Sequence, residues 1–266
     1  MFRRLGDLGE IAFVPFTVLG DPNPEASLEA IRAMISGGAD ALELGIPFSD
    51  PVADGPTIQA ADIRALSSGS TVHSAWNLIS RIRTENPDLP IGLLLYANLV
   101  VHGGLEAFYH NALKAGVDSV LVADLPTLEA IPFCTAARRA SIDPVLIAPP
   151  NADVQRLEII SREGRGYTYV ITRRGVTGAD EQVHLDHTAL LDTLQRFQAP
   201  PPLFGFGISK PEHVLAAKYA GAAGVISGSA VVSRIERNLG DIDSMVKDIH
   251  DFVVEMKAAT RNGGRS

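Results

Sequence analysis

The feature that most constrains the fold is a repeated alternation of short apolar runs with longer amphipathic segments. Eight runs rich in Val, Ile and Leu occur along the 266 residues, and none alternates cleanly between apolar and polar positions. Such runs are typical of parallel strands that are covered on both faces. Segments of helical period lie between them, as at 27–38, 105–116 and 152–164. The eight predicted strands are 12–19, 39–46, 90–97, 116–123, 143–149, 166–172, 202–208 and 223–229.

Eight βα units without a break in composition favour an α/β fold closed as a TIM (β/α)8 barrel, for which about 250 residues is the usual length. We therefore expect a single domain over residues 1–266. An open, doubly wound sheet is the alternative, but its GxGxxG fingerprint is missing after the first run, where the sequence reads VLGDPNP. A long connection after the second run predicts an extra helix over 56–67, ahead of a regular helix over 72–86.

Several predicted helix ends carry cap residues. Left-handed glycine caps are expected where glycine follows a periodic segment. A capping box is expected from Ser209 to Glu212, with Pro211 in the first turn. The glycines are Gly38, Gly116, Gly164 and Gly221.

Charge and cysteine content limit the partners and the compartment. The chain carries 23 Lys and Arg against 31 Asp and Glu, whereas nucleic-acid binding is expected to produce a basic patch. Cys134 is the one cysteine, which fits a reducing cytosol. Asp7, Glu10 and Pro15 interrupt the N-terminal apolar run, so a signal peptide is not expected, and no apolar stretch is long enough to span a bilayer. We expect a cytoplasmic protein without nucleic-acid or membrane partners.

Two carboxylates are the candidate catalytic residues. Glu43 lies inside the buried run ADALELGIP, where a carboxylate is either paired or kept for proton transfer. Alternation places Glu43 on the opposite face from Leu42 and Leu44, so it points into a barrel if the leucines meet the helices. Asp54 follows in the loop after the same strand. Asp50 in that loop fits ordinary turn chemistry.

Glycine turns after the last two strands predict an anion site. GFGIS (205–209) and ISGSA (226–230) each place glycines where a strand passes into a helix. Backbone N–H groups at such turns bind anions, and barrels often hold phosphate there. Gly178, in the long loop after the sixth strand, is a third candidate.

The sequence lacks the residues that Schiff-base catalysis or a metal site would require. None of the five lysines lies in a predicted strand facing the barrel, so a Schiff-base mechanism has no nucleophile. His184 and His187 form an isolated His-x-x-His pair in a polar loop, and we expect no metal.

These motifs resemble the α subunit of tryptophan synthase over nearly the whole chain. The resemblance is carried by ALELGIPFSDPVADGPTIQ, LLLYANLV, DSVLVADLP, APPNAD, GRGYTY, RGVTG, GFGIS and ISGSA. It implies a TIM barrel that splits indole-3-glycerol phosphate into indole and glyceraldehyde 3-phosphate without a cofactor of its own. It also implies an α2β2 complex with a pyridoxal-phosphate-dependent β subunit, to which the indole passes.

The resemblance also assigns roles. Glu43 matches the family's general acid/base, Asp54 the carboxylate that stabilises positive charge at the indole nitrogen, and Thr177 a lid residue that closes against the Asp54 loop. Asp50 and the loop around Pro47 match the surface facing the β subunit. The substrate walls match Phe16, Leu94, Ala123 and Tyr169, and the phosphate site matches Gly178, Phe206, Gly207, Gly228 and Ser229.

One residue and one three-residue segment depart from the family pattern, and three other functions remain open. Arg174 stands at a lid position that usually carries a small residue, and Val101–His102–Gly103 replaces an Asn-rich continuation, so lid dynamics and β contacts are expected to differ. The alternatives are a free-standing lyase that never docks a β subunit, a regulatory barrel that binds a phosphorylated metabolite, and a phosphosugar isomerase or epimerase.

Overall fold

The eight strands form a closed parallel barrel in the computed structural model, which describes residues 1–171, 188–205 and 207–261. Each strand pairs with the next, and β1 closes the barrel on β8 through Ala12↔Gly224 and Pro15↔Ser227. The strands are β1 (Ala12–Val18), β2 (Leu42–Gly45), β3 (Ile91–Leu95), β4 (Ser119–Val122), β5 (Asp143–Ala148), β6 (Thr168–Ile171), β7 (Pro202–Gly205) and β8 (Gly224–Ser227).

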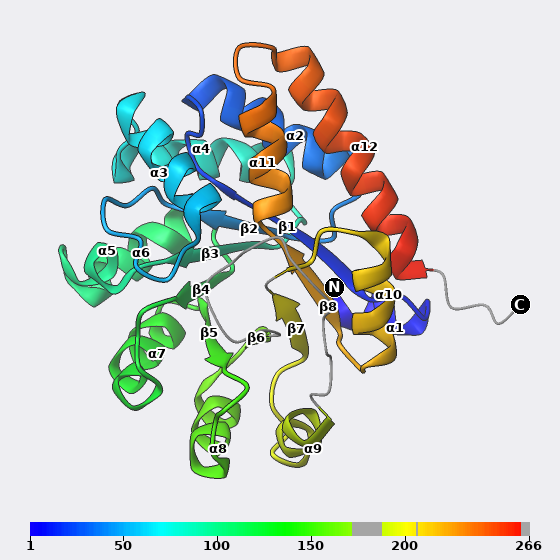
Figure 1. Cartoon of the computed structure of the whole chain (residues 1–266). Coiled ribbons are helices and arrows are strands. Elements are labelled where there is room, and N and C mark those ends of the chain that lie inside the picture. Colours follow the sequence, from blue (N-terminus) through cyan, green and yellow to red (C-terminus); the bar gives the residue numbers. More distant parts are fainter. Residues whose placement is uncertain (172–187, 206, 262–266) are drawn as a thin grey trace, which may run out of the picture.

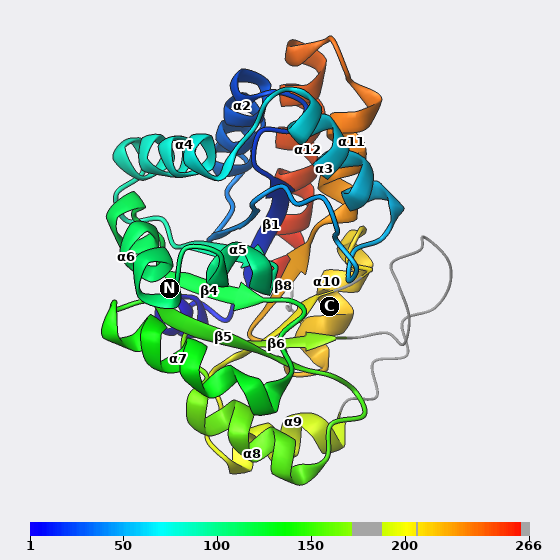
Figure 2. The same ribbon diagram turned by 90° about the vertical axis from the view of Figure 1, so that its left-hand side faces the viewer.

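Helices surround the barrel, and Figure 1 shows them on the outside of the strands. They are α1 (Phe2–Asp7), α2 (Pro24–Ser36), α3 (Pro56–Ser67), α4 (Val72–Glu85), α5 (Ala97–Val101), α6 (Leu105–Ala115), η1 (Thr127–Glu129), α7 (Ala130–Arg139), α8 (Val154–Glu163), α9 (Thr188–Arg196), α10 (Pro211–Tyr219), α11 (Ser229–Arg237) and α12 (Ile242–Arg261). The long helix α12 packs along α2, α10 and α11, and Figure 2 shows this group from the side.

Strand alternation divides the core into two apolar layers. Leu42 and Leu44 belong to the layer between strands and helices. Phe16, Leu121 and Tyr169 belong to the layer inside the barrel. Successive residues of a strand face opposite sides, so Glu43, between the two leucines, faces inward. The predicted orientation of Glu43 is therefore confirmed.

The predicted fold is confirmed, including the extra helix, because α3 spans the predicted residues 56–67. Closure through β1 and β8 rules out the open-sheet alternative. The short helices α1 and α5 have no counterpart in the prediction.

Two predicted caps are wrong. Gly164 has φ −68° and is not left-handed; a Cβ there would meet the Ile160 carbonyl oxygen at 2.7 Å, so close approach explains the glycine. Helix α10 takes Lys210 as its N-cap without a side-chain bond, while the Ser209 amide donates to Nδ1 of His213. Pro211 does occupy the first turn.

A buried ion cluster joins the last helix to the first strand. Nζ of Lys257 in α12 donates to Oδ2 of Asp40 at 2.8 Å and to Oε2 of Glu10 at 3.0 Å. Oδ2 of Asp40 also accepts a 2.9 Å hydrogen bond from the amide of Phe13 in β1. Asp40 precedes β2 and Glu10 precedes β1, so the cluster lies at the N-terminal end of the barrel, away from the strand ends where barrel active sites form.

Candidate active site

Glu43 is a buried carboxyl inside the barrel. Glu43 is 1% exposed and lies in register with Phe16 of β1 and Gly92 of β3. Oε1 accepts a 2.6 Å hydrogen bond from the hydroxyl of Tyr167, whereas Oε2 has no hydrogen-bond partner among the described residues. One oxygen is thus held in place and the other is available to a ligand.

Burial sets the proton affinity of Glu43. Desolvation raises its pKa, the hydrogen bond from Tyr167 lowers it, and the charge of Asp54 raises it further, so that the pKa is about 7. A carboxyl group with such a pKa exists in both protonation states near neutral pH. That is the property required of a residue that both gives and takes a proton.

Asp54 lies in the loop between β2 and α3 and is held by an aromatic residue that directly follows the next strand. The hydroxyl of Tyr96, directly after β3, donates to Oδ2 of Asp54 at 2.6 Å. The amide of Ala53 donates to the same hydroxyl at 3.0 Å, and Nε2 of Gln59 donates to the Asp54 carbonyl at 2.8 Å. Burial raises the pKa of Asp54, while the Tyr96 hydrogen bond lowers it.

The charges of both carboxylates reach Tyr169 on the far side of the barrel. Burial is the main cause that raises the pKa of the Tyr169 hydroxyl, followed by the charges of Glu43 and Asp54. A Cβ at Gly205, on the neighbouring strand β7, would overlap the Tyr169 ring, so the glycine provides the space that this ring occupies. Glu43, Asp54 and Tyr169 therefore share one electrostatic environment.

The predicted apolar walls also belong to the inner layer of the barrel. Phe16 is 6% exposed, while Leu94 and Ala123 are partly buried against the same cluster. The Phe16 ring lies beside Gly45 and Gly228, where a Cβ would meet ring atoms at 3.0 Å and 3.3 Å. These residues leave an apolar surface around the open side of Glu43.

The loops after β7 and β8 meet at the same end of the barrel. Oγ of Ser227, the last residue of β8, donates to the carbonyl of Ile208 at 2.6 Å, which ties the end of β8 to the loop after β7. Gly207 has φ +80°, a conformation that favours glycine. Gly228 is the N-cap of α11, so this helix directs its first amides, beginning at Ser229, out of its N-terminus. This arrangement suits an anion.

Three predicted site residues lie outside the described residues: Thr177, Gly178 and Phe206. Arg174, which the resemblance places in a lid, and the pair His184 and His187 also lie outside them. Within the described parts of the chain, no group of three or more His, Cys, Asp or Glu residues could hold a metal ion.

Sequence reasoning missed two tyrosines that hold the carboxylates. Tyr167 contacts Glu43 and Tyr96 contacts Asp54. A signal for Tyr167 was present, because it stands two residues before Tyr169 and side chains at that spacing share a face of a strand. Tyr96 stands where β3 ends, and the ends of strands form barrel active sites.

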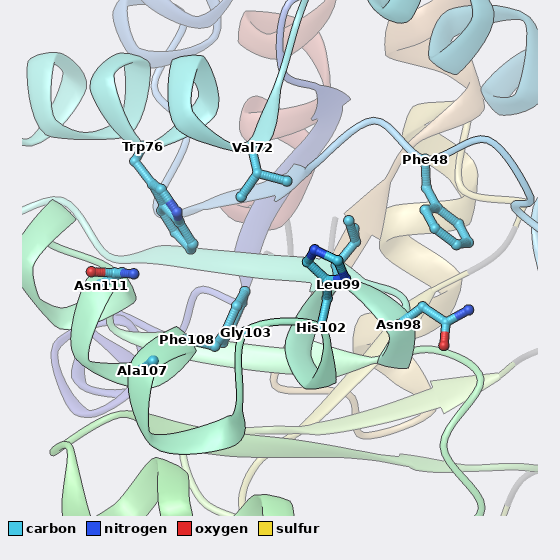
Figure 3. A pocket seen from close by; sticks show the side chains of 10 residues that line it. All are labelled: Phe48, Val72, Trp76, Asn98, Leu99, His102, Gly103, Ala107, Phe108 and Asn111. Atoms are coloured by element: carbon cyan, nitrogen blue, oxygen red, sulfur yellow. The ribbon is translucent and has the colours of Figure 1, made fainter.

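A pocket of about 410 Å³ opens beside the Asp54 loop (Figure 3). In Figure 3 Phe48 from the β2–α3 loop lies on the right, Trp76 from α4 lies on the left, and His102 and Leu99 from the α5 region lie between them. Val52 in the same loop is 78% exposed and Val101 is 46% exposed. The lining residues are Phe48, Val72, Trp76, Asn98, Leu99, His102, Gly103, Ala107, Phe108 and Asn111.

The chain matches a family model over almost its whole length. The model for the tryptophan synthase alpha chain matches residues 2–261. The chain belongs to the tryptophan synthase alpha chain family. The tryptophan synthase alpha chain of Pectobacterium atrosepticum is 52% identical over 262 residues, which cover 98% of each chain. That of Cronobacter sakazakii is 54% identical, over 98% of this chain and 97% of the relative.

Solved structures of tryptophan synthase have the same fold. The chain resembles one in the tryptophan synthase α2β2 complex of the hyperthermophile Pyrococcus furiosus, with a TM-score of 0.85 and 35% identity, over 94% of this chain and 99% of that chain. The family resemblance read from the motifs is thus confirmed. None of the helices in the described ranges is long and apolar enough to cross a membrane.

Proposed function

We propose that this chain cleaves indole-3-glycerol phosphate into indole and glyceraldehyde 3-phosphate, the reaction expected of a tryptophan synthase alpha chain. The observation that carries the proposal is the environment of Glu43, a buried carboxyl with a pKa of about 7 and a free Oε2 among the described residues. Cleavage requires that indole C3 gains a proton and that the adjacent glycerol hydroxyl loses one. The bond between C3 and the glycerol carbon then breaks, its electrons restore the aromatic indole, and the aldehyde forms.

Glu43 serves both proton transfers, and Asp54 stabilises the positive charge that develops at the indole nitrogen. The hydrogen bond from Tyr96 supports this role because it favours the carboxylate form of Asp54. Phe16, Leu94, Ala123 and Tyr169 surround the indole ring.

The phosphate group binds at the loops after β7 and β8. We assign it to Gly207, Gly228 and Ser229, together with Gly178 and Phe206, which lie outside the described residues. Backbone amides at a helix N-terminus bind an anion without a basic side chain. The family resemblance assigns a lid role to Thr177, which lies outside the described residues.

The partner in this proposal is a tryptophan synthase β subunit in an α2β2 complex. It carries the pyridoxal phosphate, while this chain needs no cofactor of its own. The pocket of Figure 3 and the exposed side chains of Val52 and Val101 provide an apolar docking surface that includes Phe48 of the Asp54 loop. This continuity supports communication between β docking and Asp54. A cytoplasmic location and a single domain over residues 1–266 stay predictions.

The test mixes the protein with indole-3-glycerol phosphate and measures free indole before and after a β subunit is added. We expect slow release from the isolated chain and strong activation on association. Activity that is unaffected by a β subunit indicates a free-standing lyase. Binding without turnover indicates the regulatory barrel, and conversion of ribulose 5-phosphate in place of indole-3-glycerol phosphate indicates the isomerase.

A further inference from the structure

Asp62 is a buried carboxyl that the proposed reaction does not use. It lies in the middle of α3 and is 5% exposed. Its neighbours on the buried face of that helix are Ile58, Ala61 and Ala65, which are all apolar. A carboxyl in such a face is costly unless it accepts hydrogen bonds, so its partner indicates its role.

The partner is the loop that carries Asp54. Oδ1 of Asp62 accepts a hydrogen bond of 3.2 Å from the amide of Phe48. The Phe48 ring stacks on the ring of Tyr96, with 5.3 Å between centroids and 22° between planes. The Tyr96 hydroxyl in turn holds Oδ2 of Asp54 and accepts from the Ala53 amide. Asp62 thus reaches Asp54 through one backbone amide and one ring pair.

We propose that Asp62 is a positioning residue for Asp54. Asp62 fixes Phe48 against Tyr96, so that the Tyr96 hydroxyl points at the Asp54 carboxylate. This inference rests on the proposed function, because it takes Asp54 to act on the substrate. Phe48 also lines the pocket of Figure 3. Asp62 therefore anchors the segment that separates the proposed docking surface from the reacting carboxylate.

The surroundings of Asp62 make this anchor sensitive to pH. Burial raises its pKa to about 7; the Phe48 amide lowers it, and the charges of Asp54 and Asp21 raise it. Asp21 is paired with Arg64 of α3 at 2.7 Å, and Arg64 also pairs with Glu236 of α11 at 3.2 Å. Tyr96 is a further titratable group that faces Asp62. A protonated carboxyl is a weaker acceptor than a carboxylate. The hold on Phe48 is therefore strongest above pH 7 and weakens as the pH falls.

The experiment measures kcat and KM for indole release by Asp62→Ala, Asp62→Asn, Tyr96→Phe and the double variant Asp62→Ala/Tyr96→Phe. Ser67→Ala, at an exposed position in the last turn of the same helix, is the matched control. We expect kcat of Asp62→Ala to fall about tenfold or more with KM within about twofold, because small misplacements of a reacting group are costly. Asn keeps an acceptor oxygen for the Phe48 amide, so at pH 8 the Asp62→Asn variant should retain at least about half of the wild-type kcat.

Two further readouts separate positioning from a general loss of structure. In the Tyr96→Phe background the effect of Asp62→Ala should shrink to about twofold, since both act on Asp54 through the same contact. In the pH profile of kcat/KM, the fall toward acid pH should be less steep for Asp62→Asn than for the wild type, because one titrating group is gone. Independent effects of Asp62→Ala and Tyr96→Phe overturn the proposal, as does an Asp62→Asn variant that loses as much kcat as Asp62→Ala.

Asp54→Asn is assayed in parallel. If Asp54→Asn keeps its activity, the proposed function of this site is wrong. If Asp54→Asn is inactive while Asp62→Ala has wild-type kcat, the proposed function stands and the role of Asp62 is wrong. If Asp62→Ala does not fold, the pH profile of kcat/KM for Asp62→Asn tests the proposal. An acid limb with the same slope as that of the wild type overturns it.

Discussion

The hydroxyl of Tyr167, directly before β6, donates a 2.6 Å hydrogen bond to Oε1 of Glu43 in β2, and β6 lies four strands from β2 around the barrel. This contact crosses the barrel interior. It leaves Oε2 of Glu43 as the oxygen without a partner among the described residues. The contact from Tyr167 thus determines which oxygen of Glu43 remains available to a ligand.

Replacing Glu43 by Gln should abolish cleavage without unfolding the barrel. The amide is nearly isosteric and can still accept from Tyr167, but it cannot transfer a proton. Loss of a positioned acid/base is expected to cost about 10²–10⁴ in kcat. Steady-state indole release measures this, with thermal unfolding and binding of a substrate analogue as controls. Retention of more than a few percent of the rate would remove Glu43 from its role.

The Asp54→Asn variant should also be nearly inactive, because a neutral amide cannot stabilise a cationic indole. We expect kcat to fall about 10²-fold or more, the scale of losing one preorganised electrostatic group. The measurement is steady-state indole release at saturating substrate, with KM compared separately. Normal turnover would reduce Asp54 to a turn residue.

A Tyr167→Phe variant should move the titration of Glu43 to higher pH. The Tyr167 hydrogen bond favours the carboxylate and lowers the Glu43 pKa from the value that burial alone would give, so its removal raises that pKa above about 7. The pH profile of kcat/KM checks the shift. Tyr109→Phe, a buried tyrosine in the layer outside the strands, is the matched control. A shift to lower pH contradicts the assignment.

Replacing Gly228 by Leu should weaken binding of glycerol 3-phosphate more than binding of indole. A side chain at the N-cap of α11 covers the first amides of the helix, and one lost hydrogen bond to a charged group costs about 1.5–3 kcal/mol. Because a Cβ there would meet the Phe16 ring at 3.3 Å, a small loss for indole is also expected. Calorimetric titration of both ligands measures the difference, with Gly6→Ala as control. Equal losses would place the phosphate elsewhere.

The Lys257→Met variant should lower stability with little effect on chemistry. Removal of the ammonium group takes the buried cation away from Asp40 and Glu10, although Glu10 keeps Arg261 at 3.5 Å. Breaking a buried ion pair costs about 3–5 kcal/mol. Lys257 is the main cause that lowers the pKa of Glu10, so in the wild type this stabilisation is present above the usual Glu pKa and is lost as the pH falls. Urea unfolding at pH 7 and pH 4 tests both effects. An unchanged difference between wild type and variant at the two pH values contradicts the ionic account.

The fold and the two carboxylates could be predicted from local pattern, whereas their partners could not. Leu42 and Leu44 fix the side on which Glu43 lies, and all eight strands follow from runs of apolar residues. The contacts of Asp62 and Tyr96 join segments that are distant in sequence, through a backbone amide and through a hydroxyl. No periodicity marks such contacts, because they depend on how a loop folds over the end of the barrel. The Gly164 error has the same origin, since close approach and left-handed geometry both select glycine.

The ion cluster of Lys257 with Asp40 and Glu10 has a consequence for biosynthesis. A ribosome releases β1 and Asp40 long before it makes β8 and α12. Strand β1 therefore has no β8 to pair with, and Asp40 and Glu10 have no Lys257 to bind, until nearly all of the polypeptide has emerged from the ribosome. Barrel closure and neutralisation of this cluster are consequently late events, and until then the apolar face of β1 and the two carboxylates stay exposed.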